Sequence, residues 1–175
     1  VDTSSRILCY DIRDLGKQLQ PVGMLVMLDS VFNRIIRNRK LGKNTWVYID
    51  EIYLLFQHEY SANFLFTLWK RVRKYGACCT GLTQNVDDLL QSHTARTMLA
   101  NSEFLVMLNQ AATDRAELAN LLNISDNQLS YITNVDSGRG LIKCGSAIVP
   151  FMNSFPKNRL YQLMTTRPSE TMAAA

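Results

Sequence analysis

Residues 46–49 form a short apolar run that ends abruptly in two acids, and this run constrains the fold more than any other feature of the chain. It reads Trp-Val-Tyr-Ile and is followed by Asp50 and Glu51. A segment that is apolar on both faces is typical of a strand buried in a parallel sheet. Ligands in open α/β sheets bind at the carboxyl ends of such strands. The sequence therefore predicts that both acids face a ligand site.

The two acids have the layout of a Walker B motif. In that motif the first acid helps to hold the Mg²⁺ of a nucleotide, and the second polarises the attacking water. Carboxylates placed in a buried site cost free energy unless they meet a cation or a reacting water. The alternative is that Asp50 only caps a turn, which is a common role for aspartate at the end of a strand. The motif taken alone leaves both interpretations open.

Apolar periodicity predicts strands and helices that alternate along the first two thirds of the chain. The helices are expected to end at Gly42 and Gly76. The expected strands are 7–10, 46–49, 77–82 and 104–108, and the expected helices are 24–38 and 64–72. This order predicts right-handed crossovers and an α/β fold with a mostly parallel sheet flanked by helices.

The last third of the chain has a different pattern. A short helical pair is expected, and its second helix begins at Ser125 with Gln128 three residues later, as in a capping box. The arms 140–144 and 147–151 flank a Gly-Ser pair, which predicts a β-hairpin with a type II′ turn. A DNA-reading helix-turn-helix is the less favoured alternative for the helical pair, because its second helix has almost no basic residues.

Composition narrows the function classes. The chain has 175 residues, is 47% hydrophobic and has a formal net charge of +4, so it is expected to be globular without a strong preference for nucleic acid. Its cysteines form no C-x-x-C pair and only two histidines are present, which argues against a zinc site or a disulfide framework. We expect Cys78 and Cys79 to be inert core thiols. No apolar run is long enough to cross a bilayer, and no signal peptide is expected.

Two further groups are candidates for the same chemistry. Gln84 follows the strand after the acidic one, and a neutral amide there can hydrogen-bond a γ-phosphate or the attacking water. Its alternative role is to start the next helix. Arg71 and Arg73 lie at the basic end of the preceding helix, where they complement the helix macrodipole. Their alternative role is that of an arginine finger offered to the nucleotide of a neighbouring subunit.

Four ordered motifs together resemble the conjugative-transfer ATPases of type IV secretion, the VirB-four class with its TraE/TrsE-like members. They are residues 46–56, 69–76, 83–90, and the pair 138–142 with 149–151. The resemblance spans nearly the whole chain. It implies a RecA-like P-loop NTPase core of the HerA–FtsK type, and it implies ATP and Mg²⁺ as cofactors.

The resemblance also implies residue roles. Asp50 would be the acid associated with Mg²⁺, Glu51 the catalytic base and Gln84 the phosphate sensor. Arg73, with Arg71 second, would act at a subunit boundary. The segment Gly138, Arg139 and Gly140 would lie near the base of the nucleotide, where the absence of side chains at the two glycines allows close approach.

One departure from the family is large, because the chain contains no G-x-x-x-x-G-K-[ST] phosphate loop. The sequence at 42–45 is a decoy, since it follows a helix and lacks the first glycine. We therefore interpret residues 1–168 as the C-terminal part of an ATPase domain, followed by a flexible tail at 169–175. This part alone is predicted to be inactive, and its sheet is predicted to have an exposed edge that favours association.

The resemblance implies partners for the intact protein. They are further copies of itself in a hexamer and other components of a type IV secretion system, at the cytoplasmic face of the membrane and attached to it through those components. Direct contact with DNA stays open. Two alternatives remain beside the motor. One is a non-catalytic interaction module, and the other is a related FtsK/HerA-type DNA translocase, which the low positive charge supports little.

Overall fold

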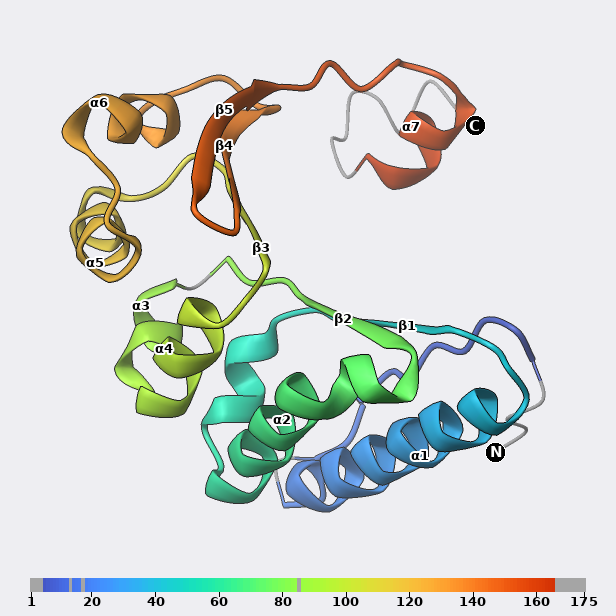
Figure 1. Cartoon of the computed structure of the whole chain (residues 1–175). Helices are drawn as coiled ribbons and strands as arrows, with labels where there is room; N and C mark the ends of the chain where they lie inside the picture. The colour runs from blue at the N-terminus through green and yellow to red at the C-terminus, as the bar shows by residue number, and fades with distance from the viewer. Residues whose placement is uncertain (1–4, 13, 17, 85, 166–175) are drawn as a thin grey trace. The chain divides into compact units, whose positions relative to one another are not determined.

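The computed structural model describes residues 5–12, 14–16, 18–84 and 86–165. The chain divides into two compact units, Val1–Asn101 and Ser102–Ala175, and each is described separately below (Figure 1). The division falls within the single domain predicted for 1–168. The predicted tail at 169–175 lies outside the described residues.

The first unit is a parallel pair of strands with helices packed on one face. Strands β1 (Thr45–Ile49) and β2 (Ala77–Gly81) pair in parallel, in a register that sets Val47 opposite Cys79. The helical elements of this unit are α1 (Gln20–Lys40), η1 (Ile52–Phe56), α2 (Glu59–Arg71), η2 (Val72–Tyr75), α3 (Val86–Gln91) and α4 (His93–Ala100). The predicted helix ends are confirmed, because Gly42 and Gly76 both have positive φ directly after the helical segments.

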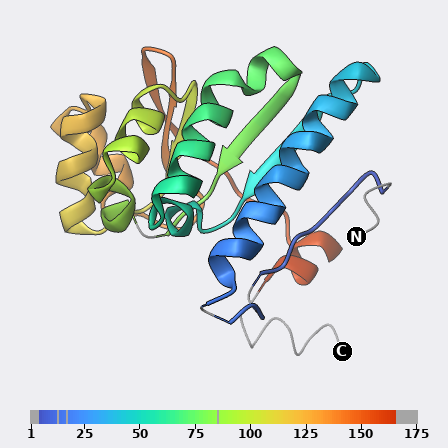
Figure 2. The same ribbon diagram turned by 90° about the horizontal axis from the view of Figure 1, so that it is seen from below.

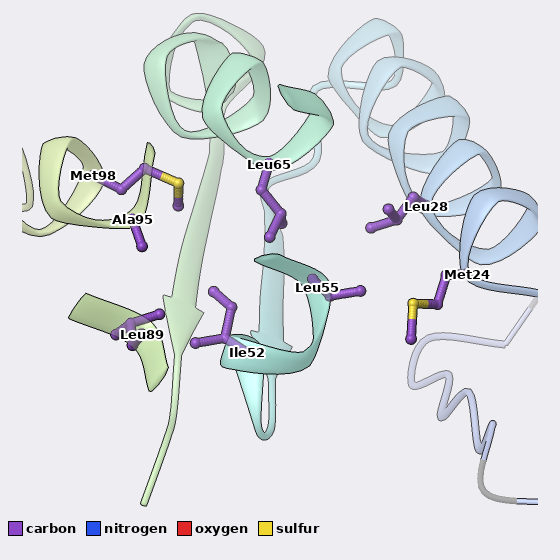
Figure 3. Packing of buried hydrophobic residues seen from close by; sticks show 8 residues of the cluster. All are labelled: Met24, Leu28, Ile52, Leu55, Leu65, Leu89, Ala95 and Met98. Atoms are coloured by element: carbon purple, nitrogen blue, oxygen red, sulfur yellow. The ribbon is translucent and has the colours of Figure 1, made fainter. Parts of the chain in front are cut away.

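Two clusters of buried side chains hold this unit together. Ile35, Leu68 and Val72 pack around Ala77, and Val47 and Cys79 contact this cluster from the inner face of the strands. The larger cluster joins α1, η1, α2, α3 and α4, with Leu65 of α2 fully buried within it (Figure 3). Its buried members are Met24, Leu28, Ile52, Leu55, Leu65, Leu89, Ala95 and Met98. Burial of these groups is the main favourable term that fixes the strands against the helices.

The opposite face of the strands is exposed. Trp46 and Tyr48 alternate with the inner residues of β1 and are 65% and 68% exposed. They share this face with Cys78 and Thr80, which the register places opposite them. A parallel sheet is normally covered on both faces. The expectation that the whole 46–49 run is buried is therefore wrong for every second residue.

The predicted first strand at 7–10 is also wrong. The segment has no strand assignment and is exposed at Ile7 and Cys9. Side-chain contacts attach this segment to α1 instead. The Tyr10 and Ser30 hydroxyls lie 2.8 Å apart, and the Arg34 guanidinium donates to the Ser5 carbonyl. An apolar run becomes a strand only where a neighbour accepts its backbone hydrogen bonds, and none does so for this segment in the described part of the chain.

The second unit is an antiparallel sheet with helices. Strand β4 (Arg139–Cys144) pairs with both β3 (Phe104–Met107) and β5 (Ala147–Met152), giving the order β3-β4-β5. The helical elements are α5 (Ala112–Leu122), α6 (Asp126–Leu129), η3 (Ser130–Ile132) and α7 (Arg159–Met164). The sequence predicts that β3 extends the parallel sheet, but within the described residues β3 pairs only with β4, in antiparallel orientation. Residues 108–138, which include α5, α6 and η3, connect β3 to β4, so this pairing joins segments that are distant along the chain.

The local predictions for this unit are confirmed. The Ser125 side chain accepts from the Gln128 backbone N–H, and the Gln128 side chain accepts from the Ser125 N–H, which completes the capping box. In the hairpin turn Gly145 has a φ of 57°, as a turn that opens with glycine requires. The α/β class with a small parallel sheet, helices and a C-terminal hairpin is thus as predicted.

Candidate functional site

The parallel pairing places the C-terminal ends of β1 and β2 side by side at one end of the sheet. Ile49 pairs with Gly81 at the last rung, so Asp50 and Leu82 are the first residues beyond the sheet. Two backbone hydrogen bonds then fasten the two exits together. The Leu82 N–H donates to Ile49 O at 2.8 Å, and the Ile52 N–H donates to Leu82 O at 2.9 Å. The acids therefore leave the sheet directly beside the chain that leads to Gln84.

Glu51 meets Gln84 at this edge. The Gln84 backbone N–H donates to Glu51 Oε2 at 3.5 Å, although 33 positions separate the two residues in sequence. Glu51 is half-buried and has a left-handed backbone, with φ of 46° and ψ of 49°. That conformation costs a non-glycine residue about 1 kcal/mol or more and is over-represented at functional sites. With this backbone the Glu51 carboxylate lies beside the segment that leaves β2.

Asp50 has a contact that fits both of its proposed roles. One of its carboxylate oxygens accepts the Glu51 backbone N–H at 3.1 Å, which is the turn-capping interaction named as the alternative. The side chain is exposed. An ionised carboxylate has about four acceptor positions, so this single bond leaves capacity for a cation or water. The Asp50 carboxylate can therefore cap the turn and bind a cation at the same time.

Gln84 contributes its backbone to the acid and keeps its side chain exposed. Sequence reasoning chose this residue for its amide side chain and did not anticipate the backbone contact. It also missed Leu82, whose peptide group joins the two strand exits through both its N–H and its C=O. No side-chain property marks such a residue. Only the predicted strand order could have pointed to it.

Arg71 and Arg73 lie at the opposite end of the sheet, where the strands begin. They belong to the end of α2 and to η2, immediately before β2 begins, and the Gly76 carbonyl there accepts the Thr45 N–H that starts β1. A five-residue strand spans roughly 16 Å. Both arginines are exposed, and the structure does not bring them to Glu51. An action on the nucleotide of a neighbouring subunit stays a prediction.

Gly138, Arg139 and Gly140 belong to the second unit. A Cβ on Gly140 would collide with the backbone oxygen of Met107, and one on Gly138 would collide with that of Asn153. Arg139 forms an exposed ion pair with Asp136 at 3.6 Å. Close backbone packing therefore explains both glycines without a ligand. Their predicted place near a nucleotide base stays a prediction.

The structure also describes the glycine-lysine segment at 42–45 and the adjacent cysteines. Residues 42–45 follow α1 and lead into β1, which confirms that this glycine-lysine segment is not a phosphate loop. Cys79 is half-buried, and burial raises its pKa to about 12, with the neighbouring Cys78 adding to the rise. A protonated thiol is a poor nucleophile. Cys78 itself is exposed, so its predicted place in the core is wrong.

The acids fit a nucleotide-bound Mg²⁺ only as part of its ligand set. Mg²⁺ is commonly held by one or two carboxylates together with substrate phosphates and waters. Among the described residues no group of three or more His, Cys, Asp or Glu side chains could hold a metal ion. A hollow of about 440 Å³ is lined by Tyr53, Phe56 and Asp88 among other residues. Neither Asp50 nor Glu51 lines it. Asp50 is exposed and Glu51 is half-buried outside this hollow.

Comparisons with known proteins show which family the chain resembles and which fold it shares. The family model for the TraG P-loop domain matches residues 4–142. Among solved structures, VirB4 of Thermoanaerobacter pseudethanolicus is similar with a TM-score of 0.72 and 24% identity. The match covers 83% of this chain and 40% of that chain, so the present chain spans less than half of the VirB4 structure. Among curated proteins none matches.

Proposed function

The chain belongs to the TraG P-loop domain family, and from this premise we propose that it is the C-terminal part of an ATPase that powers conjugative DNA transfer through a type IV secretion system. The observation that carries the proposal is the approach of the Gln84 N–H to the Glu51 carboxylate at the carboxyl ends of two parallel strands. Ligands bind at such edges in open α/β folds. The expected resemblance to this class of ATPases agrees with both comparisons.

In this proposal each residue at the edge has one task. Glu51 accepts a proton from the attacking water, and its strained backbone holds the carboxylate in place. Asp50 supplies a carboxylate oxygen toward Mg²⁺, and Gln84 supplies an uncharged amide toward the phosphates. A bound Mg²⁺ would neutralise negative charge on those phosphates. Arg73, or Arg71 beside it, would serve the nucleotide of the next subunit in a hexamer.

The phosphate loop would come from a segment outside these 175 residues. Without it, the backbone N–H groups and the lysine that cradle phosphates are missing. We therefore expect the chain alone to show no micromolar affinity for ATP with Mg²⁺ in isothermal titration calorimetry. Micromolar binding by the chain alone would contradict this part of the proposal.

The catalytic role is tested in the complete ATPase. Glu51→Gln removes the proton acceptor and keeps the shape, so turnover is expected to fall by about 10²-fold or more while nucleotide binding persists. Glu59→Gln is the matched control, because Glu59 is an exposed glutamate of the same unit at the start of α2. Equal turnover in the two variants would show that Glu51 is not the base.

A second candidate function is a non-catalytic interaction module, and the exposed face of β1 favours it. Trp46 and Tyr48 present large aromatic surfaces that a partner could cover. Plasmid transfer between cells separates the two candidates. The catalytic proposal expects Glu51→Gln in the complete protein to abolish transfer. An interaction module expects transfer to be unchanged.

The proposed assembly follows from the family. We propose a homo-oligomer, a hexamer by resemblance, that works with other type IV secretion components at the cytoplasmic face of the membrane. No helix in the described part of the chain has the length and apolar character needed to cross a bilayer.

A further inference from the structure

One edge of the first unit carries a dense group of cations. We call it the basic edge, and it consists of the exposed side chains of Arg37, Arg39, Lys40, Lys43, Lys70, Arg71, Arg73 and Lys74. No acid occurs in the two sequence segments that contain them, 37–43 and 70–74. The charge of the basic edge is therefore much higher than the net charge of +4 for the whole chain suggests.

The fold brings the two segments together. Helices α1 and α2 both end at the side of the sheet where β1 and β2 begin (Figure 2). The Arg39 guanidinium lies 5.8 Å from the centre of the Tyr75 ring, which joins the end of α1 to η2. The Thr45 N–H donates to Gly76 O at 3.2 Å and joins the two loops that follow. The two basic segments thus lie at the same end of the sheet.

Helix capping explains only part of this charge. Each helix C-terminus carries about half a negative charge, so two ends are balanced by roughly one cation. Eight exposed cations mutually repel, and that repulsion is relieved when an anionic surface approaches. The excess indicates an anionic partner.

Apolar side chains within the same region indicate what kind of partner it is. Leu41 follows Lys40 at the turn after α1 and is 58% exposed, and Trp46 close by is 65% exposed. Basic segments that also expose leucine and tryptophan side chains are typical of proteins that adsorb to lipid headgroups, where the apolar groups enter the interface. A nucleic-acid backbone would use the cations but not Leu41.

We propose that the basic edge binds the surface of a bilayer rich in anionic lipid, with Leu41 inserted at the headgroup level. This inference concerns the opposite end of the strands from the acids and does not rest on the proposed ATPase. It does not need Arg71 and Arg73, which the proposed function assigns to a subunit boundary, because six other exposed cations remain on the basic edge. Each Lys or Arg near such a surface contributes about 1 kcal/mol, which corresponds to about fivefold in affinity. Salt weakens the interaction because the charges are exposed.

The test uses the 175-residue chain and vesicles of phosphatidylcholine with or without about one third phosphatidylserine, scored by co-sedimentation. Binding only to the anionic vesicles is expected. Reversal of two cations, Lys40→Glu with Lys43→Glu, should lower that affinity by about tenfold or more. The matched control is Lys157→Glu with Arg159→Glu, which makes the same charge change on exposed residues of the second unit and should bind like the unchanged chain.

Three outcomes would overturn the proposal. The first is failure of the folded chain to bind anionic vesicles at low salt. The second is an equal loss in both double variants, which would show a response to net charge alone. The third is tighter binding to single-stranded DNA than to the vesicles, together with unchanged binding to both in the Leu41→Ser variant. That result would make the basic edge a nucleic-acid surface. Circular dichroism of each variant checks that it is folded.

Discussion

The two units of this chain each pack one face of a small sheet, but the first sheet is parallel and the second is antiparallel. Each has a small sheet whose apolar side chains lie on both faces, and in each the face opposite the buried residues is exposed, at Trp46 and Tyr48 in the first unit and at Phe104, Val106 and Val149 in the second. The first unit pairs its strands in parallel through a helical crossover. The second pairs its strands antiparallel, with β4 and β5 joined by a two-residue turn and β3 added to β4 from a distant segment.

This difference decides where chemistry can be placed. A parallel pair brings two carboxyl-terminal strand ends to one edge, so Glu51 and Gln84 meet across 33 residues. An antiparallel pair alternates its strand ends and gathers no such edge. The glycines of the second unit serve backbone packing. The candidate site therefore belongs to the parallel unit. Substitutions in each unit can show how far the two units differ.

The largest effect is expected in the core of the first unit. Leu65 is fully buried, and Leu65→Ala should lower the free energy of unfolding by about 2–5 kcal/mol through the lost transfer energy and the cavity. Hydrogen exchange of each unit measures the effect, with loss of protection expected in α2 and not in β4. Leu141→Ala, at an equally buried position of the second unit, should reverse this pattern. Equal loss in both units for either variant would show that they unfold as one.

Gly140→Ala probes the packing of the second unit. The added Cβ would collide with the Met107 backbone and lie 2.9 Å from the Phe151 ring. A backbone must shift, so a destabilisation of about 1–3 kcal/mol is expected. Urea unfolding measures it, and Gly16→Ala is the control because a Cβ there meets nothing within 4 Å. An unaffected Gly140→Ala variant would remove the packing explanation and favour a ligand at this strand.

Ser125→Ala tests how local the second unit is. The change removes a capping box that is complete in the structure, so a loss of about 1 kcal/mol is expected. Ser125→Asp should retain most of the stability, because aspartate also accepts the N–H bond. Thermal unfolding of the three proteins compares them. If Ser125→Asp were as unstable as Ser125→Ala, the cap would not be the cause.

The smallest effect is a dependence on pH in the first unit. Burial raises the Cys79 pKa from 9.0 to about 12, so the folded chain keeps this proton longer than the unfolded chain. Stability from this group is complete below pH 9 and declines as the pH rises toward 12. At pH 10 the Cys79→Ala variant should lose less stability than the unchanged chain, by about 1 kcal/mol. Urea unfolding of both proteins at pH 7 and at pH 10 measures the difference. An equal loss of unfolding free energy in the two proteins would contradict the prediction.

Local features of the fold could be predicted from the sequence. Helix ends at Gly42 and Gly76, the capping box at Ser125 and the hairpin around Gly145 depend on residues within a few positions of one another. Strand pairing does not. The run at 7–10 has the composition of a strand, yet it lies along α1 because no strand pairs with it in the described residues. Strand β3 was recognised as a strand, but its antiparallel partner was not.

For the candidate site, the sequence by itself determined which residues carry the chemistry: two acids that follow an apolar strand and an amide that follows the next one. Only the tertiary structure decided that Glu51 adopts a left-handed backbone and that its carboxylate reaches the Gln84 N–H. It also decided that the arginines gather at the opposite edge with the end of α1. The physical reason is that side-chain type and local backbone preference are written along the chain, whereas pairing register and burial depend on contacts between distant segments.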